Sequence, residues 1–327
     1  MTSLPNTGDD TQPIPRALID ELDPERQRGT ASVPLSVWPT AQDSPTMQRK
    51  NRYVAESTPH PAKMLPAIAR HAIQRYTQPD DLVLDPMCGI GTTLVEAVHA
   101  GRRATGIEYE PHWVDVARAN LRLAHELGVD HDAQVFNGDA RQLASLLPPD
   151  HVGQAALVVT SPPYGPSTHG RVAVGPGEGI QKYFHRYGST VDRGNLANIG
   201  HHRLLHAFTR ILTGVTPFLR PGGYVAVTIR PWREHAELID LPSQILACGR
   251  DAGLTPVERY VALLARVAEN HLVPRGSFFQ RDFLRKQRDA GLPLHLIAHE
   301  DVLVFRTPLR PTATSRSAAE PPQSRAA

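Results

Sequence analysis

The sequence predicts an α/β fold built on a doubly wound, mostly parallel sheet. Three observations predict it: short apolar runs alternate with amphipathic segments, several runs end in a polar or acidic residue, and two glycines separate the first run from the helix that follows. With 327 residues and 40% apolar composition, the chain is long enough to bury a full core. We expect one large domain with insertions.

The individual elements follow from these patterns. The predicted strands are Leu82 to Asp85, Ala104 to Glu108, Val135 to Asp139, Ala155 to Thr160 and Tyr224 to Ile229. The predicted helices are Thr92 to His99, Pro111 to Leu127, His202 to Leu219 and Leu241 to Gly253. Val257 to Leu264 and Asp301 to Arg306 then predict two more strands, which we interpret as the antiparallel edge pair of a mixed sheet.

Polar segments rich in proline flank these elements. We expect residues 1–50 to form a disordered N-terminal arm with one short helix, and residues 308–327 to form a disordered tail. The folded domain then covers residues 51–307, with loop insertions at 165–201 and 266–298.

Charge and cysteine content exclude several classes of protein. The net charge is only +2 with histidines neutral, so no global basic field indicates nucleic acid. Cys88 and Cys248 are the only cysteines, which excludes a disulfide framework and a thiolate zinc site, and we predict no metal site. The chain shows no apolar leader and no run long enough to span a membrane, so we expect a cytoplasmic protein.

The most informative segment is Thr160, Ser161, Pro162, Pro163, Tyr164, directly after the predicted strand Ala155 to Thr160. Open α/β sheets bind ligands at the carboxyl ends of their strands. Two prolines remove two backbone N–H groups, so this turn offers a ligand mainly carbonyl oxygens. Such an edge suits an exocyclic amino group, although a structural turn with a buried tyrosine would have the same sequence.

A second constellation stands at the ends of the first three predicted strands. Asp85 precedes Gly89 and Gly91, which lead into a helix whose first turn offers free N–H groups. This loop lacks the third glycine of a dinucleotide site and the lysine of a phosphate loop, which disfavours NAD and ATP. Glu108 and Asp139 follow at the ends of the next two strands, where carboxylates can bind a ribose and an adenine amino group. The alternative is that each acid only caps the helix that follows it.

At these positions the chain resembles the S-adenosylmethionine-dependent amino methyltransferases, which include the N4-cytosine and N6-adenine DNA methyltransferases. The resemblance implies a Rossmann-like class I methyltransferase fold with a seven-stranded sheet and an antiparallel edge strand, and S-adenosylmethionine as cofactor. It implies four catalytic residues, namely Ser161, Pro162, Pro163 and Tyr164. It implies a larger cofactor-binding set, namely His60, Lys63, Asp85, Met87, Gly89, Gly91, Thr92, Glu108, Asp139 and Thr160.

The same resemblance suggests the substrate. Ser161, in place of the Asp or Asn of many relatives, favours cytosine N4 over adenine N6 in DNA. RNA enzymes that methylate guanine N2 are the alternative, and a regulator that binds the cofactor without catalysis is an alternative of another class. Cytosine C5 methylation is excluded because it needs a cysteine nucleophile, which the turn lacks.

Two clusters of basic and aromatic residues are candidates for a nucleic-acid surface. One lies after the tetrapeptide and includes Arg171, Lys182 and Arg186; the other includes Arg281, Arg285 and Lys286. Each has a solvated face or a lid as its alternative. We expect DNA as the partner, with RNA as the second possibility; the oligomeric state has no readable signal.

Overall fold

The computed structural model of the chain describes residues 33–163, 171–175, 178–183, 195–234, 236–276 and 278–309. The rest of the expected terminal arm and tail lies outside these residues. The backbone alone is described for residues 171–175 and 178–183. Within the described residues, no helix combines the length and the apolar character needed to cross a membrane.

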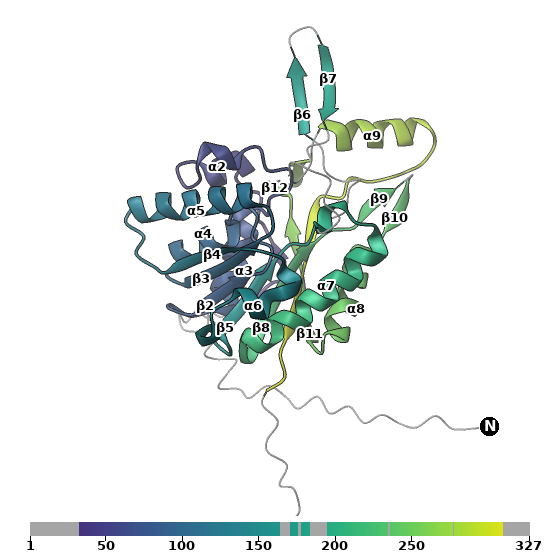
Figure 1. Ribbon diagram of the computed structural model, residues 1–327. Coiled ribbons are helices and arrows are strands. Elements are labelled where there is room, and N and C mark those ends of the chain that lie inside the picture. Colours follow the sequence, from purple (N-terminus) through teal and green to yellow (C-terminus); the bar gives the residue numbers. More distant parts are fainter. Residues whose placement is uncertain are drawn as a thin grey trace, which may run out of the picture.

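A mixed sheet of eight strands forms the centre of the molecule, with the order β1-β11-β14-β8-β5-β2-β3-β4 (Figure 1). Five of these strands run parallel to one another: β2 (Leu82–Asp85), β3 (Arg103–Glu108), β4 (Ala133–Asn137), β5 (Ala155–Thr160) and β8 (Leu219–Ile229). The remaining three are β1 (Val37–Trp38), β11 (Thr255–Leu263) and β14 (His299–Arg306). The predicted α/β class with a doubly wound, mostly parallel sheet is confirmed.

Two details of the predicted sheet are wrong. The strands β11 and β14 pair antiparallel as expected, but β14 lies between β11 and β8 and is antiparallel to both, so the antiparallel strand is internal. The sheet also gains an eighth strand, because β1 pairs in parallel with β11 at the edge. A two-residue strand has no periodicity that a sequence pattern can show.

This eighth strand comes from the expected disordered arm. Residues 33–50 instead carry β1 and the helix α2 (Pro45–Arg49), whose N-cap Ser44 accepts a hydrogen bond from the backbone N–H of Met47. Trp38 is buried and stacks on Tyr260 of β11, with ring centroids 4.4 Å apart. Burial of one large aromatic side chain stabilises this short segment by about 2 kcal/mol, which explains its order among prolines.

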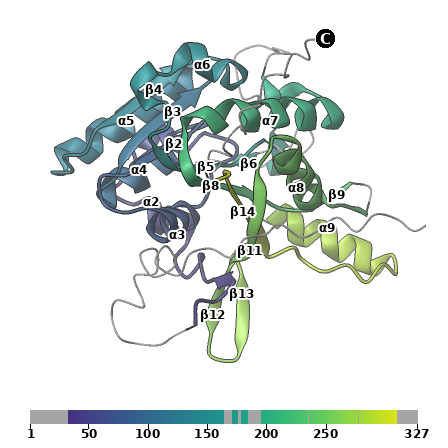
Figure 2. The ribbon, with the colours of Figure 1, turned by 90° about the horizontal axis from the view of Figure 1, so that it is seen from below.

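Helices cover both faces of the sheet (Figures 1 and 2). The apolar sides of α3 (Pro66–Tyr76), α4 (Thr92–His99) and α5 (Pro111–Glu126) pack on one face. Those of α6 (Leu143–Leu146), α7 (His201–Val215) and α8 (Leu241–Asp251) pack on the other. Some observed bounds differ from the predicted ones in β4, β8 and α7. The largest difference is in β8, which begins at Leu219, five residues before the predicted Tyr224.

The expected insertions contain regular structure. The first includes the hairpin of β6 (Arg171–Gly175) and β7 (Glu178–Tyr183), and the second holds β12 (Ala265–Ala268), β13 (His271–Pro274) and α9 (Phe278–Asp289). A further hairpin, β9 (Trp232–Glu234) with β10 (Glu237–Ile239), follows β8. The β6–β7 hairpin and α9 lie beyond the carboxyl edge of the parallel strands (Figure 1). These insertions therefore border the edge where ligands bind.

Candidate active site

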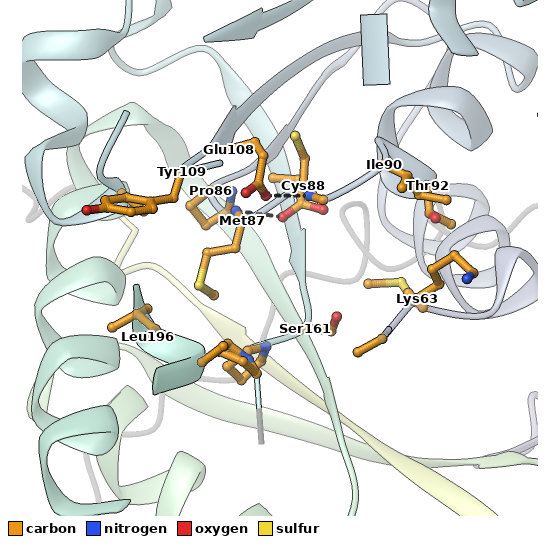
Figure 3. Close-up of a pocket in the computed structure, with 18 of the residues that line it drawn as sticks. Lys63, Pro86, Met87, Cys88, Ile90, Thr92, Glu108, Tyr109, Ser161 and Leu196 are labelled. Carbon is orange, nitrogen blue, oxygen red and sulfur yellow. Dashed lines mark hydrogen bonds between the residues drawn. The ribbon is translucent and has the colours of Figure 1, made fainter. Parts of the chain in front are cut away.

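A cavity of about 310 Å³ opens at the carboxyl edge of the parallel strands. Its volume falls within the range of small-molecule sites, which is about 300–1,000 Å³. Its lining has a cofactor side, formed by segments between residues 60 and 140, and a target side, formed by the Ser161 turn and three later segments. Figure 3 shows Glu108 and Tyr109 on one side and Ser161 with Leu196 on the other. The sequence motifs thus meet in one cavity.

Residues 85–93 are here called the glycine loop, and all of them except Gly91 line the cofactor side of the cavity. Gly89 has φ +54° and Gly91, the N-cap of α4, has φ +80°, a region that L side chains rarely adopt. A Cβ atom at Gly89 would lie 3.1 Å from Nε2 of His60, so a side chain there would crowd the cavity wall. Met87, Gly89 and Thr92, which the resemblance assigns to cofactor binding, line the cavity. The loop brings bare backbone to the edge of the site.

Asp85 is buried at the end of β2 and organises this loop. Its Oδ1 accepts a hydrogen bond from the N–H of Met87 at 3.0 Å, and its Oδ2 accepts one from Thr93 Oγ1 at 2.6 Å. Burial raises the pKa of Asp85 to about 6, although these hydrogen bonds act in the opposite direction. The carboxyl lines the cavity and shapes the turn, whereas the N-cap of α4 is Gly91, so the alternative of Asp85 as a helix cap is wrong.

Glu108, at the end of β3, is bound to backbone from two segments. Its Oε2 accepts the N–H of Gly89 and its Oε1 accepts the N–H of Glu110, both at 2.9 Å. Burial raises the pKa of Glu108 to about 7, against the effect of these two hydrogen bonds. A carboxylate has about four acceptor positions, so two remain for a ligand such as a ribose diol.

Asp139 is the acid that most clearly has a structural role. It is the N-cap of the short helix Ala140–Gln142, accepting the N–H of Arg141, and it forms a two-pronged ion pair with the Arg141 side chain. Partial burial acts to raise its pKa, but the hydrogen bonds and charge of Arg141 outweigh this and lower the pKa. Asp139 still lines the cavity, so capping and contact with a ligand are compatible.

Residues 52–64 form a strap along the cofactor side, and residues 60–64 of this strap line the cavity. Its His60 ring packs edge-on against Trp113 at 4.6 Å, and Lys63 Nζ donates to the carbonyl of His60 at 2.7 Å. The fully buried Asn120 of α5 ties the strap to the glycine loop: Oδ1 accepts the N–H of Val54 at 2.7 Å and Nδ2 donates to the carbonyl of Ile90 at 2.8 Å. Sequence patterns did not single out Asn120, because it lies on the apolar side of a regular helix.

The target side joins segments that are distant along the chain. Ser161, Pro162 and Pro163, which the resemblance assigns to catalysis, line the cavity directly after β5. The other lining residues on this side, which sequence patterns missed, are Asn195, Leu196, Ala197, Arg230 and Glu300. Asn195 caps the short helix Leu196–Asn198 and donates to Glu110 Oε1 at 2.6 Å, which links this segment to the cofactor side. In the sequence, the signal for this segment is an asparagine at a position that can cap a short helix.

The other predicted site residues either lie outside the cavity lining or are not described by the structure. Gly91 and Thr160 do not line the cavity: Gly91 caps α4, and Thr160 is fully buried at the end of β5. Tyr164 and Arg186 lie outside the described residues, and only the backbone of Arg171 and Lys182 is described. Arg281, Arg285 and Lys286 are exposed on α9, where Asp282 pairs with Arg285 at 2.7 Å and Lys286 at 2.9 Å.

The cofactor side fits S-adenosylmethionine. Bare glycine backbone and the start of α4 suit its charged methionine end, and Glu108 has open acceptor positions for a ribose. The strand order, with one antiparallel strand inserted beside β8, is that of the class I S-adenosylmethionine-dependent methyltransferases. The fold is that of this class of methyltransferases.

A comparison with known protein families gives a match over part of the chain. The sequence model of the N6/N4 DNA methylases, described as DNA methylase, matches residues 10–119. Over these residues the chain is similar to this family. The match covers the strap, the glycine loop and Glu108, and ends before Ser161.

Individual relatives include enzymes of DNA and of RNA. A tRNA (guanine(10)-N2)-dimethyltransferase of Methanocaldococcus jannaschii is 31% identical over 37% of this chain and 34% of its own length. The DNA adenine methyltransferase YhdJ of Escherichia coli is 31% identical over 37% of this chain and 39% of its own. The type II methyltransferase M.ScaI of Streptomyces caespitosus is 32% identical over 27% and 28%. The chain therefore spans about a third of the length of these curated relatives.

Among solved structures, TrmN from Thermus thermophilus is 16% identical, with a TM-score of 0.46 over 80% of this chain and 53% of that chain.

Proposed function

We propose that this protein transfers a methyl group from S-adenosylmethionine to an exocyclic amino group of a DNA base, with N4 of cytosine ahead of N6 of adenine. One observation carries the proposal: Ser161 and Pro162 line the same cavity as Asp85, Gly89 and Glu108. Acceptors for an amino group and the groups suited to a methyl donor thus face one space.

The chemistry requires positioning more than acid or base. The lone pair of an exocyclic amine is delocalised into its ring, which makes the nitrogen a poor nucleophile. Hydrogen bonds from its two N–H groups to Ser161 Oγ and the carbonyl of Pro162 favour a pyramidal nitrogen with its lone pair directed at the methyl group. Acceptors that are preset for developing positive charge act mainly on the transition state.

A base inside a duplex reaches this turn only when it is flipped out of the stack. In the proposal, Tyr164 stacks on the flipped base and offsets part of the cost. The exposed cations Arg281, Arg285 and Lys286 of α9 contact phosphates, as do Arg171, Lys182 and Arg186 of the other insertion. A Tyr164→Ala variant that keeps full turnover would contradict the stacking role.

Mass spectrometry of nucleosides tests the polymer and the base together. The full chain is incubated with S-adenosylmethionine carrying a deuterated methyl group, genomic DNA and total tRNA. We expect label in N4-methyldeoxycytidine. Label only in N2-methylguanosine would instead support guanine-N2 methylation of tRNA, the candidate favoured by the similarity to the tRNA enzyme of M. jannaschii.

A substitution in the turn tests the site. Ser161→Ala removes one acceptor, and we expect turnover to fall roughly 100-fold with unchanged affinity for S-adenosylmethionine. Ser145→Ala is the matched control, because Ser145 is exposed on α6 and does not line the cavity. Equal turnover of the two variants would refute the assignment of Ser161.

A further inference from the structure

The target side of the cavity includes a carboxylate that no motif explains. Glu300 lies at the beginning of β14, and Arg230 directly follows β8. The antiparallel register pairs Asp301 with Ile229, which sets Glu300 opposite Arg230. Both residues line the cavity that Ser161 and Pro162 line. Because β14 is antiparallel, its first residues lie at the edge where the parallel strands end.

Thr228 holds the Glu300 carboxylate in place. The buried Thr228 of β8 donates from Oγ1 to Oε2 of Glu300 at 2.9 Å. Within the described residues, Thr228 is the residue that hydrogen-bonds this carboxylate, through Oε2. A carboxylate accepts up to about four hydrogen bonds, so among the described residues most of its capacity, including that of Oε1, is open.

Strand order fixes how far Glu300 stands from Ser161. The strand β8 lies between β5, which leads into Ser161, and β14, which carries Glu300. Neighbouring strands are about 4.8 Å apart, so the two backbones are separated by about 10 Å. Val227 of β8 pairs with both Thr160 and Leu303, so Ser161 lies level with Val302 and Glu300 lies two residues further along the edge. Side chains from the two strands can therefore face one amino group that lies between them.

We propose that Glu300 is a catalytic residue that faces the target amino group, stabilises the positive charge that develops on its nitrogen, and takes up the proton that the nitrogen releases. This inference rests on the proposed function. The amine lone pair forms the new C–N bond while the electron pair of the C–S bond stays on sulfur. The nitrogen, now positively charged, gives one proton to Glu300, which returns it to water. Thr228 is a positioning residue.

The negative charge of Glu300 complements the neutral turn at Ser161. Ser161 is neutral, so the turn itself provides no negative charge for the developing cation. A fixed carboxylate in a partly enclosed site stabilises such a charge better than a hydroxyl does. Glu300 provides that carboxylate from another strand.

A binding experiment tests the place of Glu300 without any nucleic acid. Sinefungin carries a protonated amine where S-adenosylmethionine carries the transferable methyl group, whereas S-adenosylhomocysteine has nothing there. In calorimetry we expect Glu300→Gln to reduce the preference for sinefungin over S-adenosylhomocysteine about tenfold, the effect of one hydrogen bond to a charged group. An unchanged preference would overturn the proposal. Glu258→Gln, an exposed carboxylate on β11 that does not line the cavity, is the control.

Kinetics test the role. Glu300→Gln keeps the shape and the hydrogen bond from Thr228, so we expect kcat to fall roughly 100-fold with little change in KM for S-adenosylmethionine. Thr228→Val removes only the orienting hydroxyl and should lower kcat by a smaller factor. A Glu300→Gln enzyme with normal kcat would refute the role. If the native chain methylates neither DNA nor RNA, the proposed function fails, and the calorimetric comparison still decides on Glu300.

Discussion

The two sides of the cavity differ in how their polar groups are held. On the cofactor side, Asp85 and Glu108 are both bound to backbone N–H groups of the glycine loop, and Asn120 ties that loop to the strap. On the target side, Ser161, Asn195, Arg230 and Glu300 come from four separate segments. On the cofactor side, hydrogen bonds join residues of one stretch of the chain. The target side instead depends on how segments that are distant along the chain pack together.

This difference suggests that one side of the cavity binds the methyl donor and that the other side selects the target base. The family match covers residues 10–119, which include most of the cofactor side and none of the target side. A hydrogen-bonded frame that presents backbone to a common methyl donor is compatible with many substrates. In our proposal, residues on the target side contact the base, so changes there should alter the choice of base and leave the affinity for S-adenosylmethionine unchanged.

The largest expected effect is on the cofactor side. Glu108→Ala removes the acceptor of two backbone N–H groups and, in our proposal, of the ribose hydroxyls. We expect calorimetry to show an affinity for S-adenosylmethionine about 100-fold weaker, as for two lost hydrogen bonds of about 1.5 kcal/mol each. Glu126→Ala, an exposed acid on α5, is the control. Unchanged affinity in Glu108→Ala would remove Glu108 from the site.

A pH dependence of about tenfold should follow from the same residue. The pKa of Glu108 without cofactor is about 7, so the carboxyl is mostly protonated at pH 6 and mostly ionised at pH 8. Ribose hydroxyls bind the ionised form better, and affinity for S-adenosylmethionine should rise about tenfold from pH 6 to pH 8. Titrations with Glu108→Gln should lose this dependence; a dependence that persists there would assign it to another group.

The raised pKa of Glu108 also predicts how the stability of the cofactor-free protein depends on pH. The folded pKa of Glu108 lies above its usual value of 4.5, so between these two values the folded state binds more protons than the unfolded state. The contribution of Glu108 to the free energy of unfolding therefore falls as pH rises from 4.5 to about 7.

Alanine substitutions at two glycines should have a smaller effect, and they distinguish contact with the cofactor from a need for positive φ. Gly89 and Gly128 both have positive φ, but only Gly89 lines the cavity, and a Cβ at Gly128 meets nothing within 4 Å. Alanine at either position should lower the free energy of unfolding by about 1 kcal/mol. Only Gly89→Ala should also weaken S-adenosylmethionine binding, by several-fold. Equal affinities would show that the loop is needed only for the fold.

Asp139 should respond differently from the two buried acids. Asp139→Ala removes a helix cap and should cost about 1 kcal/mol of stability, whereas Asp139→Asn keeps the cap. If Asp139 also accepts the adenine amino group, Asp139→Ala should weaken S-adenosylmethionine binding a few-fold and Asp139→Asn less. Loss of stability in Asp139→Ala with unchanged affinity would show that Asp139 is a cap alone.

The smallest effect is expected outside the cavity. Replacing both Arg285 and Lys286 of α9 by alanine should weaken DNA binding a few-fold and reduce the slope of log affinity against log salt by about 2. Cofactor affinity should not change. Arg122→Ala, an exposed arginine on α5, is the control. An unaltered salt slope would exclude α9 from the nucleic-acid surface.

Local patterns predicted the cofactor side well. The strand β2 and the helix α4 have their predicted bounds, because a buried strand, a glycine turn and an amphipathic helix are each visible within about ten residues. The prediction of Asp85, Gly89 and Glu108 as neighbours followed from strand ends that share one edge. Patterns missed β1, since its place depends on Trp38 reaching Tyr260, more than 200 residues away.

By itself, the sequence determined the fold class, the cofactor loop and the turn of Ser161 to Pro163, since each is written in adjacent residues. Only the tertiary structure decided that Asn195, Arg230 and Glu300 share the cavity with that turn. It also decided that β14 enters the sheet between β11 and β8, which brings Glu300 to the edge where the parallel strands end. The physical reason is that strand pairing joins segments without regard to their separation along the chain, and no local period records which strand a residue will face.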